Sequence, residues 1–157
     1  MSEFIALRSL NQNLAVVIDS DKKYSRQGIN RTKKRVVDEL GGGDAIAWVT
    51  KGREIENYVP HDVLQSAVQK VHSSKYDRPA AGGRFDHVLH FVRKDGSLCK
   101  DVDKVAVARV VCAKPASLDA LDLRKRVTDL VAMINRANGL ASVPAGASRP
   151  DRFQTGC

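Results

Sequence analysis

Two short apolar runs in the first third of the chain have the composition of β-strands inside a sheet. Residues 14–18 form a continuous run with three β-branched residues and polar residues on both sides. Residues 45–50 form a second run of this kind. Continuous apolar runs of this length are typical of strands buried on both faces. We therefore expect residues 14–18 to form a buried central strand and residues 45–50 to form a second strand.

A helical pattern lies between the two runs. Its apolar residues recur at helical spacing, with basic residues between them: Ile29, Val36, Val37 and Leu40. Three glycines at 41–43 end the pattern, because consecutive glycines lose too much backbone entropy to stay helical. Strand, helix and strand with short links predict a βαβ unit with parallel strands and a right-handed crossover.

The next part of the chain gives less uniform signals. Pro60 suits the first position of a helix, and the following residues to Val71 supply its apolar stripe. Residues 73–83 are polar and contain Pro79 and two glycines, which predicts a mobile loop. Beyond this loop, four apolar residues fit one face of a further helix: Phe85, Val88, Leu89 and Val92.

Two segments follow in the last third of the chain. Residues 105–111 are rich in β-branched residues and fit either a strand or a helix. From Leu123 to Ile134 an apolar stripe predicts a helix, with acidic residues near its start and Gly139 after its end.

These elements predict an α/β fold with a small parallel sheet flanked by helices. We expect a βαβ core over residues 1–72 and a helical C-terminal part of the same domain over residues 73–140. Residues 141–157 are rich in Pro, Gly, Ser and Arg, which predicts a disordered tail.

Composition excludes some classes and favours one kind of partner. With 43% hydrophobic residues the chain can bury a core, which excludes a disordered or fibrous protein. Its 26 Lys and Arg against 18 Asp and Glu give a net charge of +8, which attracts polyanions and nucleic acid first. Simple solubility is the other explanation of such a charge.

The cysteines and the hydropathy pattern predict a cytoplasmic protein without a membrane partner. Cys99, Cys112 and Cys157 lie far apart and outside any CxxC spacing, which indicates thiols in a reducing compartment and not zinc ligands. No apolar run approaches the roughly 18 residues of a membrane helix. The first residues do not have the pattern of a signal peptide.

Acidic residues follow both predicted strands, at the edge where α/β sheets carry their sites. Asp19 and Asp21 come after the first strand, and their spacing puts both carboxylates on one side if the chain stays extended. Glu54 and Glu56 come after the second strand; on a regular helix they would point about 200° apart. Oxygen donors of this kind suit Mg²⁺ or Mn²⁺. Capping and surface carboxylates are the other interpretation of these four residues.

Basic residues near these positions are candidates for contact with phosphate. Lys104 opens the segment at 105–111 and could stabilise charge that develops on a phosphate, although a single lysine is more often a solvated surface charge. Four more basic residues could follow a nucleic-acid backbone: Lys33, Lys34, Arg35 and Arg53.

Three strings of the sequence together resemble the C-terminal TOPRIM domain of OLD-family (overcoming lysogenization defect) nucleases. The strings are Leu-Ala-Val-Val-Ile-Asp-Ser-Asp at 14–21, Asn-Arg-Thr-Lys-Lys-Arg-Val-Val-Asp-Glu at 30–39 and Trp-Val-Thr-Lys-Gly-Arg-Glu-Ile-Glu-Asn-Tyr at 48–58. The resemblance covers roughly residues 4 to 140, and its strongest part is the combination of the first and third strings.

The resemblance implies a TOPRIM-like fold and a metal-dependent DNA endonuclease, a hydrolase with a two-metal site. Asp19 and Asp21 match the family's DxD acids, and the third string supplies a further ligand, with Glu54 preferred over Glu56. Lys104 matches a lysine that precedes a late helix, which favours a helix at 105–111. Two metal ions, Mg²⁺ or Mn²⁺, about 4 Å apart, would activate a water for attack on a phosphodiester and stabilise the leaving oxygen.

The same resemblance implies partners outside these residues. In the family, an ABC-type ATPase precedes the TOPRIM domain, and a glutamate in a Glu-Gly context lies upstream of the DxD acids. Glu3 does not have that context, and no GxxxxGK[ST] motif occurs. We therefore expect the chain to be a fragment or a truncated reading frame, whose ATPase is an N-terminal region or a separate chain. A homodimer is left open.

Two alternatives to the nuclease remain. One is a non-catalytic basic module that binds DNA or a partner protein. The other, ranked third, is a phosphatase or phosphotransferase of the haloacid-dehalogenase type, in which Asp19 would be the nucleophile and Asp21 the acid/base. Lys22 and Lys23 stand where that class usually has glycine and threonine.

Overall fold

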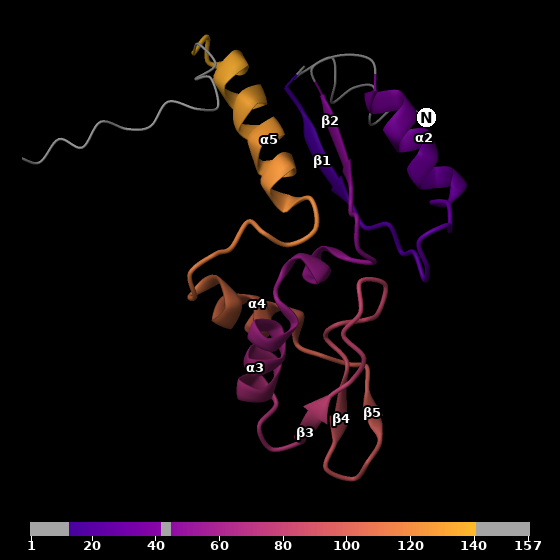
Figure 1. Ribbon diagram of the computed structural model, residues 1–157, viewed down its shortest axis with the longest axis vertical. Helices are drawn as coiled ribbons and strands as arrows, with labels where there is room; N and C mark the ends of the chain where they lie inside the picture. Colours follow the sequence, from indigo (N-terminus) through magenta and orange to yellow (C-terminus); the bar gives the residue numbers. More distant parts are fainter. Residues whose placement is uncertain (1–12, 42–44, 141–157) are drawn as a thin grey trace, which may run out of the picture.

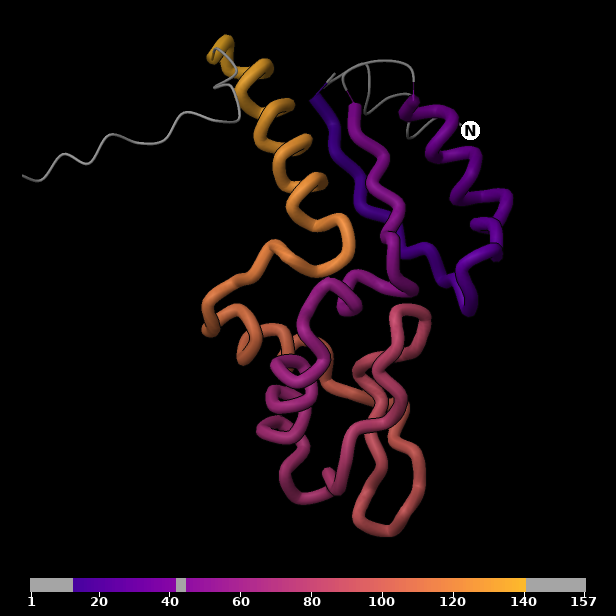
Figure 2. Tube along the Cα trace, viewed as in Figure 1, coloured from indigo at the N-terminus to yellow at the C-terminus, as the bar shows by residue number. Residues whose placement is uncertain are grey.

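The described part of the chain is residues 13–41 and 45–140 of a computed structural model. It forms two halves that meet near the middle of the molecule (Figures 1 and 2). One half contains a two-stranded parallel sheet, and the other contains a three-stranded antiparallel sheet. Helices pack against both halves, so the predicted α/β fold class is confirmed. The tail predicted at 141–157 lies outside the described residues.

The first half contains the predicted βαβ unit. Its elements are β1 (Ala15–Ile18), α2 (Arg31–Leu40) and β2 (Ile46–Val49). The two strands pair in parallel along their whole length, as predicted. Helix α2 begins where it does because the side chain of Asn30 accepts a hydrogen bond from the amide of Lys33 and so caps the helix.

The prediction that β1 is a buried central strand is wrong for the described residues. Within residues 13–41 and 45–140, β1 pairs only with β2 and therefore lies at a sheet edge. Its alternate side chains remain accessible, and Val17 is 50% exposed. The apolar run identified the strand but not its position in the sheet.

The second half contains the main hydrophobic core. It begins with a 3₁₀ turn, η1 (Ile55–Tyr58), and continues into α3 (His61–Val71), which follows Pro60. Helix α4 (Lys104–Cys112) packs against α3, so the ambiguous segment at 105–111 is a helix, as the family resemblance favoured. The core residues come from α3, α4, the antiparallel strands and the turn before β4: Leu64, Ala67, Val68, Tyr76, Val88, Leu89, Phe91, Cys99 and Val107.

Residues 73–99 differ from the prediction. The expected loop at 73–83 contains β3 (Tyr76–Pro79), and the helix expected at 85–92 is wrong, because the chain there turns and enters β4 (Phe91–Arg93). Strand β5 (Leu98–Cys99) completes the antiparallel order β3-β4-β5. Tyr76 and Phe91 stack at 5.2 Å between ring centroids, which buries both rings against α3.

Helix α5 (Leu123–Ala137) runs beside the parallel sheet, on the side opposite α2 (Figure 1). Tyr58 connects α5 to the rest of the structure. The Tyr58 hydroxyl donates a hydrogen bond at 2.6 Å to Oδ1 of Asp122, the residue just before the helix. The same hydroxyl accepts from the amide of Lys51 at 2.9 Å and from Trp48 Nε1 at 3.2 Å. No helix in the described ranges is both long and apolar enough to cross a membrane.

Candidate metal centre and active site

The carboxyl ends of β1 and β2 are joined by a buried hydrogen-bond network. The amide of Ser20 donates to Thr50 Oγ1 at 2.8 Å, and the Ser20 hydroxyl donates to the carbonyl of Gly52 at 2.6 Å. Ser20 and Thr50 are each 3% exposed. Because these polar groups satisfy one another in the interior, they fix the backbone on both sides of Ser20. The network therefore sets the positions of the acidic residues that flank it.

Asp19 and Asp21 leave this network in different ways. Asp19 Oδ1 accepts a hydrogen bond from the amide of Ile55 at 2.8 Å, 36 residues further along the chain. Asp21 has a φ of 54°, so the chain does not stay extended there, in contrast to the condition in the sequence argument. Its amide donates to the carbonyl of Arg53 at 2.9 Å, and its carboxylate pairs with Lys33.

Glu54 and Glu56 approach the same lysine. Glu54 has an extended backbone and precedes η1, where its amide donates to Asn57 Oδ1 at 2.8 Å. The segment is therefore not a regular helix, and the two glutamates need not diverge as they would on one. Glu54 Oε2 lies 3.8 Å from Lys104 Nζ, and Glu56 Oε1 lies 2.8 Å from the same nitrogen. The irregular turn brings both candidate ligands to one place.

Lys104 reaches this place from the first turn of α4. The side chain of Asp103 caps the helix by accepting a hydrogen bond from the amide of Ala106 at 2.9 Å. This cap makes Lys104 the first residue of the helix. Burial alone lowers the pKa of Lys104, but the hydrogen bond to Glu56 and the charges of Glu56, Glu54 and Asp19 outweigh it, so the pKa is raised. The lysine is therefore held as a cation next to three carboxylates.

The carboxylates also act on one another. The pKa of Asp19 is raised, first by burial and then by the negative charges of Glu56, Glu54 and Asp21, against the opposing hydrogen bond from Ile55. All four predicted acidic residues thus contribute to one negative field. In addition, Glu56 Oε2 is buried and has no hydrogen-bond partner among residues 13–41 and 45–140. A buried carboxylate oxygen without a partner is costly unless a further cation or donor satisfies it.

His87 belongs to the site but was not found by the sequence analysis. Its Nδ1 lies 2.6 Å from Glu54 Oε1, and it comes from the turn before β4. That turn is held against the end of β2, since the amide of Arg53 donates to the carbonyl of Arg84 at 3.1 Å. Gly52 allows this close approach, because a Cβ there would lie 2.6 Å from Asn57 Cβ and 3.2 Å from the Arg84 carbonyl. The sequence carried no signal for His87, because the turn was expected to be part of a helix.

The predicted nucleic-acid-binding residues fall into two groups. Lys34 and Arg35 are exposed on α2, where they line a shallow hollow. Lys33 instead turns inward, pairing with Asp21 and donating to the carbonyl of Asp19 at 2.6 Å. Arg53 is also largely covered, with its Nε 3.5 Å from Glu54 Oε1. Lys33 and Arg53 therefore neutralise part of the acidic cluster, whereas Lys34 and Arg35 face solvent.

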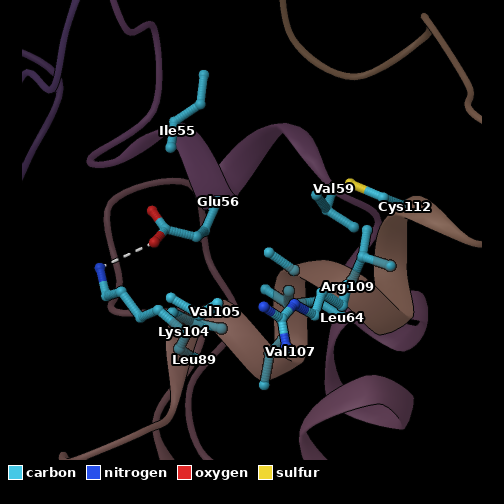
Figure 3. Close-up of a pocket in the computed structure, with 12 residues that line it drawn as sticks. Ile55, Glu56, Val59, Leu64, Leu89, Lys104, Val105, Val107, Arg109 and Cys112 are labelled. Atoms are coloured by element: carbon cyan, nitrogen blue, oxygen red, sulfur yellow. Dashed lines mark hydrogen bonds and ion pairs between the residues drawn. The ribbon is translucent and has the colours of Figure 1, made fainter.

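An apolar groove of about 560 Å³ lies beside the Glu56–Lys104 pair (Figure 3). It runs along α4 towards Cys112, with Val59 and Leu64 on the α3 side. The groove explains why Glu56 Oε2 finds no partner, since the carboxylate lies between the acidic cluster and an apolar wall. It also lowers the local dielectric around the Glu56–Lys104 ion pair.

The site as a whole consists of Asp19, Asp21, Glu54 and Glu56, with Lys33, Arg53 and Lys104 as counter-charges and His87 beside Glu54. No set of three or more His, Cys, Asp and Glu residues within the described ranges is arranged to hold a metal ion. Comparison of the chain with protein-family models, curated proteins and solved structures finds no match. The resemblance to OLD-family TOPRIM domains therefore stays a prediction.

Proposed function

We propose that this chain is the TOPRIM-type endonuclease domain of an OLD-like ATPase-nuclease, which hydrolyses DNA phosphodiesters with Mg²⁺ or Mn²⁺. The observation that supports it best is the gathering of Glu54 and Glu56 at Lys104, with Asp19 near enough for its charge to raise the pKa of that lysine. These residues come from three segments separated by up to 85 positions, as 104 − 19 gives. Carboxylates collected next to a lysine suit the binding of a cation and of a phosphate at adjacent positions.

The donor types suit a hard divalent cation, although no three of them are grouped as a metal site within residues 13–41 and 45–140. The four carboxylates offer only oxygen ligands, which Mg²⁺ and Mn²⁺ prefer. Glu56 Oε2 has no partner among the described residues and is a donor that a cation would satisfy. Burial, and after it the charges of the neighbouring carboxylates, raises the pKa of Asp19. In this structure Lys104, Lys33 and Arg53 balance part of the remaining charge, and His87 contacts Glu54.

Each residue then has a distinct task. Asp19, Glu54 and Glu56 would hold the cation, which supplies a Lewis acid and a water of lowered pKa. Ser20 and Thr50 keep Asp19 in place through the buried network. Lys104 would neutralise charge that develops on the phosphate. Lys34 and Arg35, which are exposed on α2, would contact the DNA backbone without reading its sequence.

A metal titration and a nicking assay test this function. We expect Mn²⁺ to bind the chain in calorimetry, and the double variant Asp19→Asn/Asp21→Asn to lose that binding. Glu54→Gln and Glu56→Gln, measured separately, identify which glutamate is the stronger ligand. Lys94→Ala is a suitable control, because it removes one charge on the β4–β5 hairpin, away from the carboxylates.

The nicking assay uses supercoiled plasmid with Mn²⁺ or Mg²⁺, with and without an added OLD-like ATPase. Nicking that requires Asp19 supports the nuclease. If Mn²⁺ binds but no DNA is cleaved even with the ATPase present, the nuclease assignment is wrong.

A non-catalytic basic module is the second candidate, and one observation favours it. Three of the four carboxylates already have a cationic or imidazole partner in the structure: Asp21, Glu54 and Glu56. A cluster that neutralises itself in this way can serve to hold the two halves together. Absence of Mn²⁺ binding, combined with salt-dependent DNA binding, would favour this module over the nuclease.

A further inference from the structure

A small cavity lies beside Glu54. Its volume is about 220 Å³, and it is lined by four residues that carry or can carry positive charge, together with Glu54 and two apolar side chains: His87, His90, Lys100 and Lys104. The rings of His87 and His90 stack with centroids 4.6 Å apart and form one wall. This volume is below the roughly 300–1,000 Å³ of pockets that hold a drug-sized ligand, so it suits a small group such as a phosphate.

Lys100 and Lys104 supply the positive charge of this cavity, whereas a lowered pKa favours the neutral form of His90. Burial lowers the pKa of His90, and the charges of His87, Lys100 and Arg53 lower it further, while Glu54 alone raises it. Glu54 is the one carboxylate in the lining, and three partners already surround it: Arg53, His87 and Lys104. Its negative charge is therefore largely compensated before any ligand arrives.

Lys100 has a positive charge that no group in the described part of the chain pairs with. It follows β5 and is exposed at the edge of the cavity. Within residues 13–41 and 45–140, its ammonium group makes no hydrogen bond or ion pair. A lysine in this position can donate to an anion without first breaking an internal contact, whereas Lys104 must share its charge with Glu54 and Glu56.

We propose that this cavity binds a phosphate group of the nucleic acid, with Lys100 as its principal contact and Lys104 shared with the carboxylate site. The inference rests on the proposed function for the identity of the anion as nucleic-acid phosphate. Lys104 then lies between two adjacent positions, the cation held by the carboxylates and the phosphate in the cavity. The phosphate next to the one that is cleaved would thereby fix the register of the strand.

The first experiment uses inorganic phosphate as the probe, in the presence of a chelator so that the result does not depend on a metal. We expect a saturable shift of the His87 and His90 signals in nuclear magnetic resonance. Lys100→Ala should weaken this binding about tenfold, the scale of one lost hydrogen bond to a charged group. Lys100→Arg should retain the binding, and Lys94→Ala, on the same hairpin, should leave it unchanged.

The second experiment asks which phosphate enters. Short single-stranded oligonucleotides with a 5′-phosphate or a 5′-hydroxyl compete against inorganic phosphate. Displacement by the phosphorylated strand alone identifies a terminal phosphate, and equal displacement by both identifies an internal diester. Displacement by neither, an absent histidine shift, or an equal loss in Lys94→Ala and Lys100→Ala overturns the proposal.

The outcomes for the cavity and for the nuclease can be separated. If phosphate binding requires Lys100 but Mn²⁺ does not bind at Asp19, the phosphate site is supported and the nuclease proposal is wrong. If the chain nicks DNA with Mn²⁺ and Lys100→Ala changes neither KM nor kcat, the nuclease is supported and the phosphate site is wrong.

Discussion

Asp19 differs from the other three acidic residues of the site. Within the described ranges its carboxylate has no cation within 4 Å, and its one contact is the amide of Ile55. Burial and three neighbouring negative charges raise its pKa. The ionised form of Asp19 is therefore unfavourable in the folded state, and a bound cation would stabilise it.

Asp19→Asn should consequently stabilise the fold at neutral pH. The pKa of Asp19 is higher in the folded protein than its ordinary value of 3.8. Between these two pKa values the folded protein binds more protons than the unfolded chain, so the free energy of unfolding falls as the pH rises. The amide keeps an oxygen for Ile55 but removes the charge. We expect a gain of about 0.5 kcal/mol in the free energy of unfolding, a figure discounted for solvent screening.

Urea denaturation at several pH values measures this effect. The gain should disappear as the pH falls below the ordinary value of the Asp carboxyl, and Asp101→Asn, an exposed carboxylate outside the cluster, should show none. A variant that is less stable than the wild type at pH 7 would contradict the electrostatic account of Asp19.

Lys104→Ala should separate metal binding from catalysis. The ammonium group lies 2.8 Å from Glu56 and competes with a cation for the same carboxylate, so its removal should strengthen Mn²⁺ binding. The same change should reduce DNA cleavage about 100-fold or more, as expected when a group that stabilises transition-state charge is removed.

Calorimetry gives the Mn²⁺ affinity, and single-turnover cleavage gives the rate. Lys114→Ala, just beyond the end of the same helix, should alter neither. Weaker Mn²⁺ binding in Lys104→Ala would mean that the lysine supports the carboxylates and does not compete with the cation.

At this scale the sequence located the carboxylates and the basic residues Lys33, Arg53 and Lys104 beside them, but not His87. Asp19, Asp21, Glu54 and Glu56 could be found because they follow two recognisable strands, and the structure brings them together. His87 could not be found in this way, because its place depends on a turn that packs against a segment 33 residues earlier, as 87 − 54 gives. Tertiary contacts of this kind leave no local pattern.

Among the elements, the turn after β2 is the most constrained. Gly52 is enclosed by Asn57 and by the Arg84 carbonyl, and its own carbonyl accepts from Ser20. Gly52→Ala must displace one of these neighbours, because a Cβ 2.6 Å from Asn57 Cβ cannot be accommodated. We expect a loss of about 1–3 kcal/mol in stability and a loss of Mn²⁺ binding.

Gly28→Ala is the matched control for this change. A Cβ at Gly28 meets no atom within 4 Å, so the variant should be neutral or slightly more stable, through a less flexible unfolded chain. Thermal denaturation of both variants provides the comparison. Equal stability of the two would show that the turn after β2 adapts more easily than its contacts indicate.

The elements that the sequence predicted well have clear patterns. The βαβ unit, α3 and α5 were recognised from apolar runs, from helical periodicity and from end signals such as Pro60 and Gly139. The helix expected at 85–92 failed because apolar residues at spacings of three and four also occur where a turn leads into a strand. Asp95-Gly96, with a φ of +81° at the glycine, was the missed signal for a β4–β5 hairpin.

For the whole molecule, Tyr58 is the main connection between the turn after β2 and α5. Its hydroxyl contacts Trp48, Lys51 and Asp122 at once. Tyr58→Phe leaves the Lys51 amide and the Asp122 carboxylate without this partner, which should cost about 1–3 kcal/mol. We also expect faster hydrogen exchange along α5, because the rest of that helix buries little, with Met133 as its one fully buried residue among those described.

Chemical denaturation and hydrogen exchange measured by mass spectrometry check this prediction. Tyr24→Phe is the control, since that ring is 61% exposed. If exchange in α5 is unchanged in Tyr58→Phe, the helix is held by contacts other than this hydroxyl.

The contacts between Asp19 and Ile55 and between Glu56 and Lys104 span 36 and 48 residues. Contacts of such range form late, because loop closure must precede them, whereas the helices form locally and early. A ribosome that releases this chain residue by residue cannot complete the acidic site before Lys104 has emerged. Until then the carboxylates have only Lys33 and Arg53 as basic partners, so the proposed nuclease site would stay incomplete until most of the chain has been made.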